Sequence, residues 1–163
     1  MEMSEESLEE NYLDLLRRYP TGVTVVSTTF EGRDYGSTMN SFTTVSMNPP
    51  LVAVFIMKGS RTLNAVEKSG KFVVSLLSGY QEEAARIFSQ DGDEDKFGKF
   101  GQCKTDEGIA YLQNSIGRIE CQLQTSQDIA DHRMIIGSVK NYNVHNQSPS
   151  LMYYRRRFYS TDQ

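Results

Sequence analysis

The stretch Gly36–Pro50, GSTMNSFTTVSMNPP, decides the predicted fold. It places seven small polar side chains in one strand-like run, which ends at the double proline Pro49–Pro50 before the apolar run Leu51–Met57. Thr and Val favour extended backbone, but so many polar groups cannot all face a dry interior unless each finds a hydrogen-bond partner. We therefore predict a strand from Gly36 to Ser46 whose polar side chains face either a ligand or the solvated side of an edge strand.

Apolar periodicity on both sides of this stretch predicts the remaining elements. Strands are expected at 23–29, 51–57, 72–77, 118–124, 134–144 and 151–154, and helices at 7–19, 60–70 and 81–88. Capping-box spacing at Ser7–Glu10 marks the start of the first helix. The acidic cluster at 91–95 reads as a solvated loop. Short links without regular βαβ alternation favour a mostly antiparallel barrel or sandwich.

Length and composition restrict the class of protein. A chain of 163 residues without a composition shift is expected to form one domain, 1–163. Its 17 basic and 21 acidic residues give a net charge of −4, which argues against nucleic acid or anionic lipid as a partner. Apolar runs of about seven residues are too short for a membrane span, and the acidic N-terminus is unlike a leader, so a cytoplasmic protein is expected. Cys103 and Cys121 are expected to be reduced thiols, with Cys121 in the core and no metal site.

Two local motifs could carry chemistry. Ser60-Arg-Thr62 opens a helix, where free N–H groups, two hydroxyls and a guanidinium suit a phosphate, and Lys58 could add charge. An ordinary N-cap beside a solvated arginine is the alternative. His132 follows Asp131, which could fix its tautomer or cap a turn. His145 lies in a polar loop and is expected to be exposed.

The sequence resembles the flavin reductase-like family of FMN-binding split barrels. The run from Gly36 to Val52 is similar to the signature of that family, and the stretches 19–28, 60–78, 131–139 and 151–159 resemble later parts of it in the same order. The resemblance implies a six-stranded antiparallel, Greek-key-like split β barrel with a few short helices. It also implies a homodimer with flavin near the subunit interface.

The resemblance further implies site residues. Thr38, Met39, Asn40 and Ser41 should line the flavin ring and ribityl chain, with Ser46 close by. Ser60, Arg61 and Thr62, with Lys58, should hold the FMN phosphate. The cofactor is expected to be FMN or FAD.

The nicotinamide side carries departures from the family pattern. His132 should lie near the nicotinamide as the catalytic residue, but Ala130 stands where the family usually has glycine before the Asp-His pair. Arg155 or Arg157 is a candidate for the pyrophosphate of NAD(P)H. Arg156 stands at the usual glycine and Phe158 at the usual tyrosine.

The implied activity is an NAD(P)H:FMN oxidoreductase that passes reduced flavin to a partner monooxygenase or another acceptor. Hydride passes directly between the two rings, so no Ser–His–Asp or Cys–His constellation is required. An electron-transfer flavoprotein that holds FMN without oxidising nicotinamide is the main alternative. A split-barrel module that binds another ligand is the third.

Overall fold

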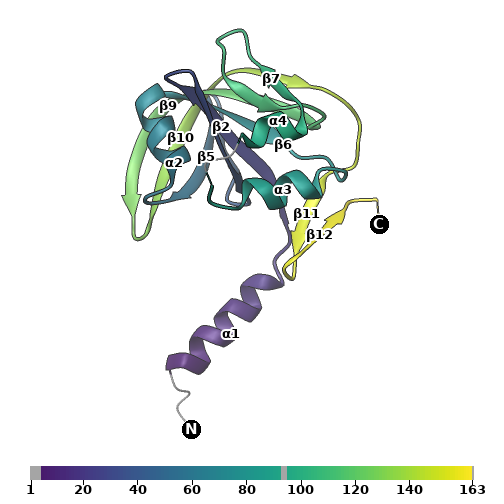
Figure 1. The fold of residues 1–163 in the computed structure, drawn as a ribbon. Coiled ribbons are helices and arrows are strands. Elements are labelled where there is room, and N and C mark those ends of the chain that lie inside the picture. The colour runs from purple at the N-terminus through teal and green to yellow at the C-terminus, as the bar shows by residue number, and fades with distance from the viewer. Residues whose placement is uncertain (1–4, 93–94, 163) are drawn as a thin grey trace.

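The computed structural model describes residues 5–92 and 95–162, and strands make up most of its regular structure (Figure 1). The helices are α1 Glu5–Arg17, α2 Arg61–Ser69, α3 Glu82–Phe88 and α4 Lys96–Phe100. The strands are β1 Thr21–Gly22, β2 Thr24–Phe30, β3 Arg33–Met39, β4 Thr43–Met47, β5 Pro50–Met57, β6 Lys71–Leu76, β7 Gln102–Lys104, β8 Ala110–Leu112, β9 Gly117–Ile129, β10 His132–Val144, β11 Leu151–Tyr154 and β12 Arg157–Ser160. The prediction of a mostly β protein is confirmed.

A seven-stranded antiparallel sheet, in the order β3-β2-β6-β9-β10-β5-β4, forms the body of the molecule. Its two edge strands, β3 and β4, are joined by residues 40–42 alone. A link of this length spans at most roughly 15 Å, whereas the edges of a flat sheet of this size would lie about 29 Å apart. The sheet must therefore curl until its edges approach each other, which produces a barrel that is split between β3 and β4.

The strand predicted from Gly36 to Ser46 is in fact two strands. β3 pairs with β2, and β4 pairs with β5. Between them the Ser41 hydroxyl accepts the Phe55 N–H at 3.1 Å and donates to the Phe55 carbonyl at 2.9 Å. At the break, the Ser41 side chain therefore takes the place of the backbone hydrogen bonds that a continuous strand would make. The hydroxyl-rich sequence is uniform here and does not show where the strand is interrupted.

Helix α2 has the ends that its sequence predicts. The Ser60 hydroxyl accepts the Leu63 N–H, and Gly70 ends the helix in the left-handed conformation at φ 69°. Helix α4 was not predicted: Asp95, expected in a solvated loop, accepts the Gly98 N–H at 3.0 Å and caps it. Two other members of the expected acidic loop, at 93 and 94, lie outside the described residues.

Two apolar clusters occupy the two sides of β2. Val26 belongs to the barrel interior, which packs against α2, and Val25 belongs to a second cluster beneath α3 and α4. Phe72 and Cys121 lie in the barrel interior, and burial raises the pKa of the Cys121 thiol to about 12. Cys121 is thus an unreactive core residue, as its alternating strand predicts.

Helix α1 projects away from the rest of the molecule (Figure 1). It is described from Glu5, so Ser7 lies inside the helix and does not cap it. Its leucine and tyrosine side chains are exposed, Leu15 by 64% and Tyr19, just beyond the helix, by 73%. The Arg155 N–H donates to the Arg17 carbonyl at 3.0 Å and ties the end of the helix to the C-terminal hairpin.

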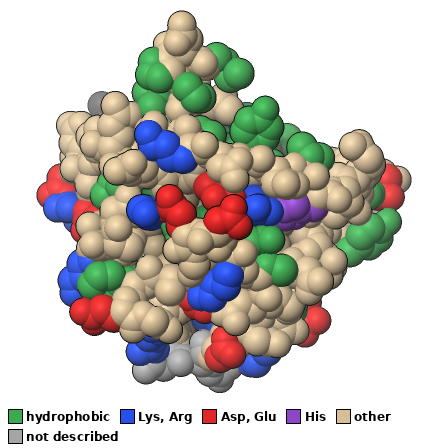
Figure 2. Space-filling model, turned by 90° about the horizontal axis from the view of Figure 1, so that it is seen from above, with side chains coloured by type: hydrophobic (Ala, Val, Ile, Leu, Met, Phe, Trp, Pro, Cys, Tyr) green, Lys and Arg blue, Asp and Glu red, His purple; other side chains and the backbone are tan. Residues whose placement is uncertain are grey.

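Charged side chains of both signs are interspersed on the face seen from above (Figure 2). None of the helices within 5–92 and 95–162 is long and apolar enough to cross a membrane.

Candidate functional site

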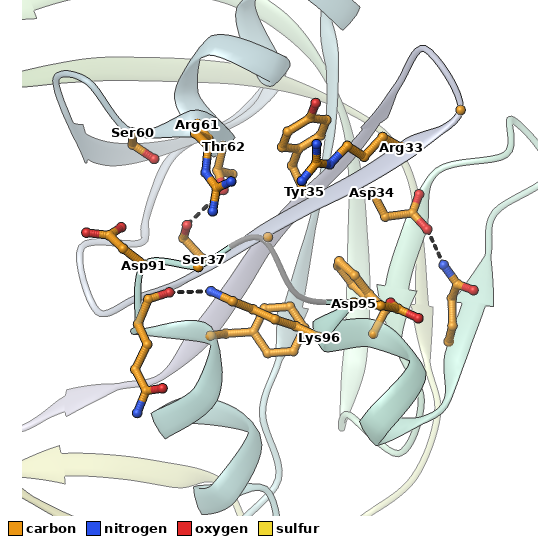
Figure 3. Close-up of a pocket in the computed structure, with 17 residues that line it drawn as sticks. Arg33, Asp34, Tyr35, Ser37, Ser60, Arg61, Thr62, Asp91, Asp95 and Lys96 are labelled. Atoms are coloured by element: carbon orange, nitrogen blue, oxygen red, sulfur yellow. Dashed lines mark hydrogen bonds between the residues drawn. The ribbon is translucent and has the colours of Figure 1, made fainter.

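The start of α2 faces a cleft of about 460 Å³ on the outer side of β3 (Figure 3). Tyr35, Gly36 and Ser37 line it from β3, and Ser60, Arg61 and Thr62 line it from α2. The three residues that the sequence predicted to hold a phosphate therefore line one cleft, although Thr62 is almost fully buried. The first N–H groups of a helix have no intrahelical partner, so this end of α2 favours an anion.

A hydrogen bond joins β3 to α2 across the floor of the cleft. The Ser37 and Thr62 hydroxyls lie 2.8 Å apart, and Thr62 is almost fully buried. Beside them, a Cβ on Gly36 would meet the rings of Phe88 and Phe97 at 2.9 Å. Only glycine therefore lets β3 pack this closely on the two phenylalanine rings, and these contacts fix the distance between the walls.

The opposite wall comes from the loop between α3 and α4. It brings Asp91, Asp95 and Lys96 to the cleft, and the Lys96 ammonium donates to the Gln90 carbonyl. Asp34, at the far end of β3, is engaged by Lys104 and Gln102. The cleft therefore carries charges of both signs, with Arg61 at the helix end. Sequence reasoning missed this wall, because it took the acidic cluster at 91–95 for a solvated loop and did not predict α4.

The strand expected to hold a flavin ring uses most of its side chains for structure. The Thr38 hydroxyl donates to the Ala85 carbonyl at 2.7 Å, and Ser41 is bound to Phe55. The half-buried Met39 packs against the barrel interior, and its carbonyl accepts the Thr24 hydroxyl at 3.0 Å. Asn40 is exposed at the break in the sheet. Its amide is the side chain of this group that remains available to a ligand.

Asn40 and Thr38 also line a second cavity of about 300 Å³, named here the hairpin hollow. Its other walls include Arg86 from α3 and Tyr153, Arg156 and Phe158 from the hairpin of β11 and β12. The hollow adjoins the cleft at the end of α3, where Phe88 and Gln90 line the cleft and Arg86 and Ser89 line the hollow. Arg156 was not among the predicted site residues. Whether a side chain in a hairpin turn faces a cavity depends on turn geometry that sequence does not show.

Ser46 and Lys58, both predicted to lie at the flavin, lie elsewhere. Ser46 on β4 accepts the Asn48 N–H at 3.1 Å and faces an apolar groove on the other edge of the sheet. Lys58 pairs with Asp128 at 3.2 Å, and its N–H donates to the Asp131 carbonyl. Neither side chain lines the cleft. Both make contacts with nearby residues that local sequence reasoning overlooked.

His132 is the first residue of β10, directly after the tight turn at Ala130 and Asp131. Its Nδ1 lies 2.8 Å from the Asp131 carboxylate, and this contact lowers the pKa of Asp131. A carboxylate only accepts hydrogen bonds, so Nδ1 carries the proton and Nε2 is left for another partner. Ala130 adopts φ 50°, which the sequence argument expected only of glycine. The turn thus has the left-handed residue that the family pattern requires, although the side chain is a methyl group.

A charged network fixes this hairpin to α2. The Arg133 guanidinium contacts Asp128 on β9 at 2.6 Å and also Glu67 on α2. His132 pairs in register with Met57, and the Ser60 N–H donates to the Met57 carbonyl at 3.2 Å. His132 and the start of α2 are therefore held on the same side of the barrel, although His132 is not among the residues that line the cleft.

His145, expected to be exposed, is half-buried. Arg118 donates to its Nε2 at 2.9 Å, and its Nδ1 donates to the Ser115 carbonyl at 3.2 Å. Burial lowers the pKa of His145, which favours the neutral ring that these contacts require. The expectation was wrong because the partners come from residues about thirty positions earlier in the chain. The role of His145 is structural.

Comparison with known proteins agrees with this architecture. A family model described as "Flavin reductase like domain" matches residues 16–162. The chain is 36% identical over 142 residues to a flavin reductase of Pseudomonas putida, covering 86% of this chain and 83% of that protein. It is 32% identical over 156 residues to the flavin reductase (NADH) of Kitasatospora aureofaciens, covering 91% and 80%.

A solved structure shows the same fold. Nitrilotriacetate monooxygenase component B from Mycobacterium thermoresistibile superposes with a TM-score of 0.88 at 29% identity, covering 95% of this chain and 87% of that one. The split barrel expected from the sequence is therefore confirmed, but its main sheet has seven strands and not the expected six. The family match spans nearly the whole described chain. The chain belongs to the flavin reductase-like domain family and is an oxidoreductase that acts on flavin.

Proposed function

We propose that this protein is an NAD(P)H-dependent flavin reductase that binds FMN and supplies reduced flavin to a partner monooxygenase. The observation that carries the proposal is the polar start of α2, with Ser60, Arg61 and Thr62 at the cleft beside β3. Two hydroxyls, a guanidinium and a helix N-terminus form a donor set that fits a phosphate ester. Relatives named as reductases that use NADH and as a monooxygenase component support the rest of the reaction.

The residues have separate tasks in this reaction. The start of α2 would bind the flavin phosphate, while Asn40 and the backbone of residues 38–41 would orient the ring at the break in the sheet. When bound, flavin supplies the N5 atom that accepts a hydride. His132, with Nδ1 held by Asp131, would direct Nε2 to the nicotinamide. Alignment of the two rings is the main demand on the protein, because the hydride passes directly between them.

One assay tests the proposal. The purified protein is mixed with FMN or FAD and with NADH or NADPH, and the absorbance of the reduced nicotinamide is followed. We expect this absorbance to fall only when both the protein and a flavin are present. The rates of the four flavin and nicotinamide combinations rank the substrates. Flavin binding without nicotinamide oxidation would instead identify an electron-carrying flavoprotein.

Replacing His132 with alanine should raise the KM for NAD(P)H or slow hydride transfer, because the ring is proposed to contact the nicotinamide. The affinity for FMN should stay within a few tenths of a kcal/mol, since His132 lies outside the cleft at α2. Steady-state kinetics and a flavin fluorescence titration measure the two effects.

Ala130→Gly is the matched control for this experiment. It relieves the positive φ of the same turn and leaves the imidazole in place, so turnover should not change. Loss of flavin binding as the main effect of His132→Ala would show that His132 supports the turn and has no catalytic role.

We also propose a homodimer. The apolar side chains of α1, including Leu15, are exposed, and so are Met47, Tyr142 and Val144 around the apolar groove near β4. One chain therefore carries two separate apolar surfaces, and a symmetric pair of copies can cover both.

Light scattering should give the mass of two chains at micromolar concentration. Leu15→Glu should shift the mass towards one chain, because it places a charge on the apolar face of α1. Glu10→Gln, which changes a charge on the same helix without touching an apolar side chain, should not. A wild-type monomer with full flavin binding would contradict the proposal.

We also propose that the reaction takes place in the cytoplasm. Cys103 and Cys121 are both free thiols, as is usual for proteins of a reducing compartment.

A further inference from the structure

The hairpin between β11 and β12 turns on two arginines in an unfavourable backbone conformation. Tyr154 pairs with Arg157, so Arg155 and Arg156 form the two-residue loop, at φ 47° and 62°. Two-residue loops with positive φ at both positions strongly favour pairs such as Asn-Gly, because a side chain is crowded there. Turn geometry alone therefore does not account for arginine at these positions.

The two side chains have different surroundings. Arg155 lies over the Tyr154 ring, with its guanidinium carbon 5.4 Å from the centroid. Arg156 lines the hairpin hollow beside Thr38 and Asn40. Within residues 5–92 and 95–162, no hydrogen bond or ion pair joins the Arg156 guanidinium to another group. Backbone strain that places an unpaired charge in a cavity is a feature of binding sites.

Arg156 is also the uncompensated charge of the hollow. The other cation, Arg86, is neutralised by Glu82 at 2.6 Å and lies over the Phe158 ring at 5.0 Å. Tyr153 and Phe158 supply aromatic walls beside the exposed Arg156 side chain. The hollow thus combines one free positive charge, aromatic surface and the Asn40 amide.

We propose that Arg156 binds a phosphate group of the nicotinamide dinucleotide in the hairpin hollow. The proposal rests on the proposed function, which brings that dinucleotide to the flavin at residues 38–41. The hollow adjoins the cleft but is distinct from it, so the anion held there is not the flavin phosphate proposed for the start of α2. A guanidinium can bind two phosphate oxygens at once, which fixes orientation as well as charge.

Arg156→Gly tests this assignment because its structural and binding effects have opposite signs. Glycine relieves the positive φ, so the melting temperature should stay the same or rise. Calorimetric titration of the full-length, FMN-loaded protein with NADP+ and NAD+ should nevertheless show Kd at least tenfold weaker for one or both. Arg156→Lys should retain part of the affinity, since lysine keeps the charge and loses the bidentate geometry.

The comparison of the two nucleotides identifies the phosphate. A loss confined to NADP+ indicates the 2′-phosphate, and an equal loss for both indicates the pyrophosphate. Glu31→Gly is the matched control, because Glu31 has φ 50° in the exposed hairpin between β2 and β3, away from the hollow. It should leave both affinities unchanged.

Three results would overturn the assignment: unchanged Kd for both nucleotides, a loss with Arg155→Gly but not with Arg156→Gly, or an effect on FMN affinity alone. The titration uses oxidised nucleotides and reports binding without turnover. A wild-type protein that binds NADP+ or NAD+ through Arg156 but oxidises neither reduced form would refute the proposed function and leave this inference standing.

Discussion

Replacing Phe72 with alanine should lower the free energy of unfolding by about 3–5 kcal/mol. Phe72 is fully buried on β6 in the barrel interior. Its ring lies so close to the backbone of β10 that a Cβ on Gly137 would fall 2.4 Å from Cζ. Strands on both sides hold their positions through ladder hydrogen bonds, so the cavity cannot collapse easily. Urea unfolding followed by circular dichroism measures the loss.

Phe30→Ala is the control, because Phe30 on β2 is only half-buried and should lose much less stability. Gly137→Ala should cost about 1–3 kcal/mol, because the added Cβ would lie 2.4 Å from Phe72 Cζ and 2.8 Å from Cys121 Cβ. In the Phe72→Ala background the same change should cost less, since only the contact with Cys121 remains. Additive losses in this cycle would show that the two positions are not in contact.

Replacing Arg61 and Thr62 together with alanine should weaken FMN binding by about 1.5–3 kcal/mol, or roughly 10- to 150-fold in Kd. Both side chains lie at the start of α2 in the cleft, where they are proposed to donate hydrogen bonds to the flavin phosphate. A fluorescence titration with FMN measures the change. Riboflavin, which lacks the phosphate, should bind the variant and the wild-type protein equally.

Two single variants test whether a change in FMN affinity comes from a general loss of positive charge or from a changed cleft floor, and not from the loss of contacts to the phosphate. Lys68→Ala removes a positive charge from the last turn of the same helix and should leave FMN affinity unchanged. Ser37→Ala removes the hydroxyl that contacts Thr62 but none of the groups proposed to bind the phosphate. Any change in FMN affinity that it causes measures the contribution of the Ser37–Thr62 contact. Unchanged FMN affinity in the double variant would remove the site from α2.

The sequence predicted what depends on local pattern. Alternation located β9 and the buried run located β5, and Ser60 and Gly70 located both ends of α2. What it missed depends on contacts between distant residues. The break at Ser41 requires Phe55 as a partner, and β9 continues beyond Gln124 because β10 pairs with it to the end of the hairpin.

The same distinction applies to the site. A helix start is a local feature, and the three residues 60–62 that the sequence singled out for a phosphate line one cleft. Lys58 seemed suited to a phosphate only while its neighbour in space, Asp128, was unknown. Arg156 faces a cavity because of a left-handed turn that glycine would normally occupy. Such a departure from a family pattern is the signal by which the sequence alone could have singled it out.

Helix α1 has a further consequence. A helix of 13 residues is marginally stable in water on its own, so its stability must come from the surface that covers its apolar side. If that surface belongs to a second chain, mass action governs the helix. Dilution should then reduce the helical circular dichroism signal while the barrel remains folded. The helical content of the N-terminal segment would therefore depend on protein concentration.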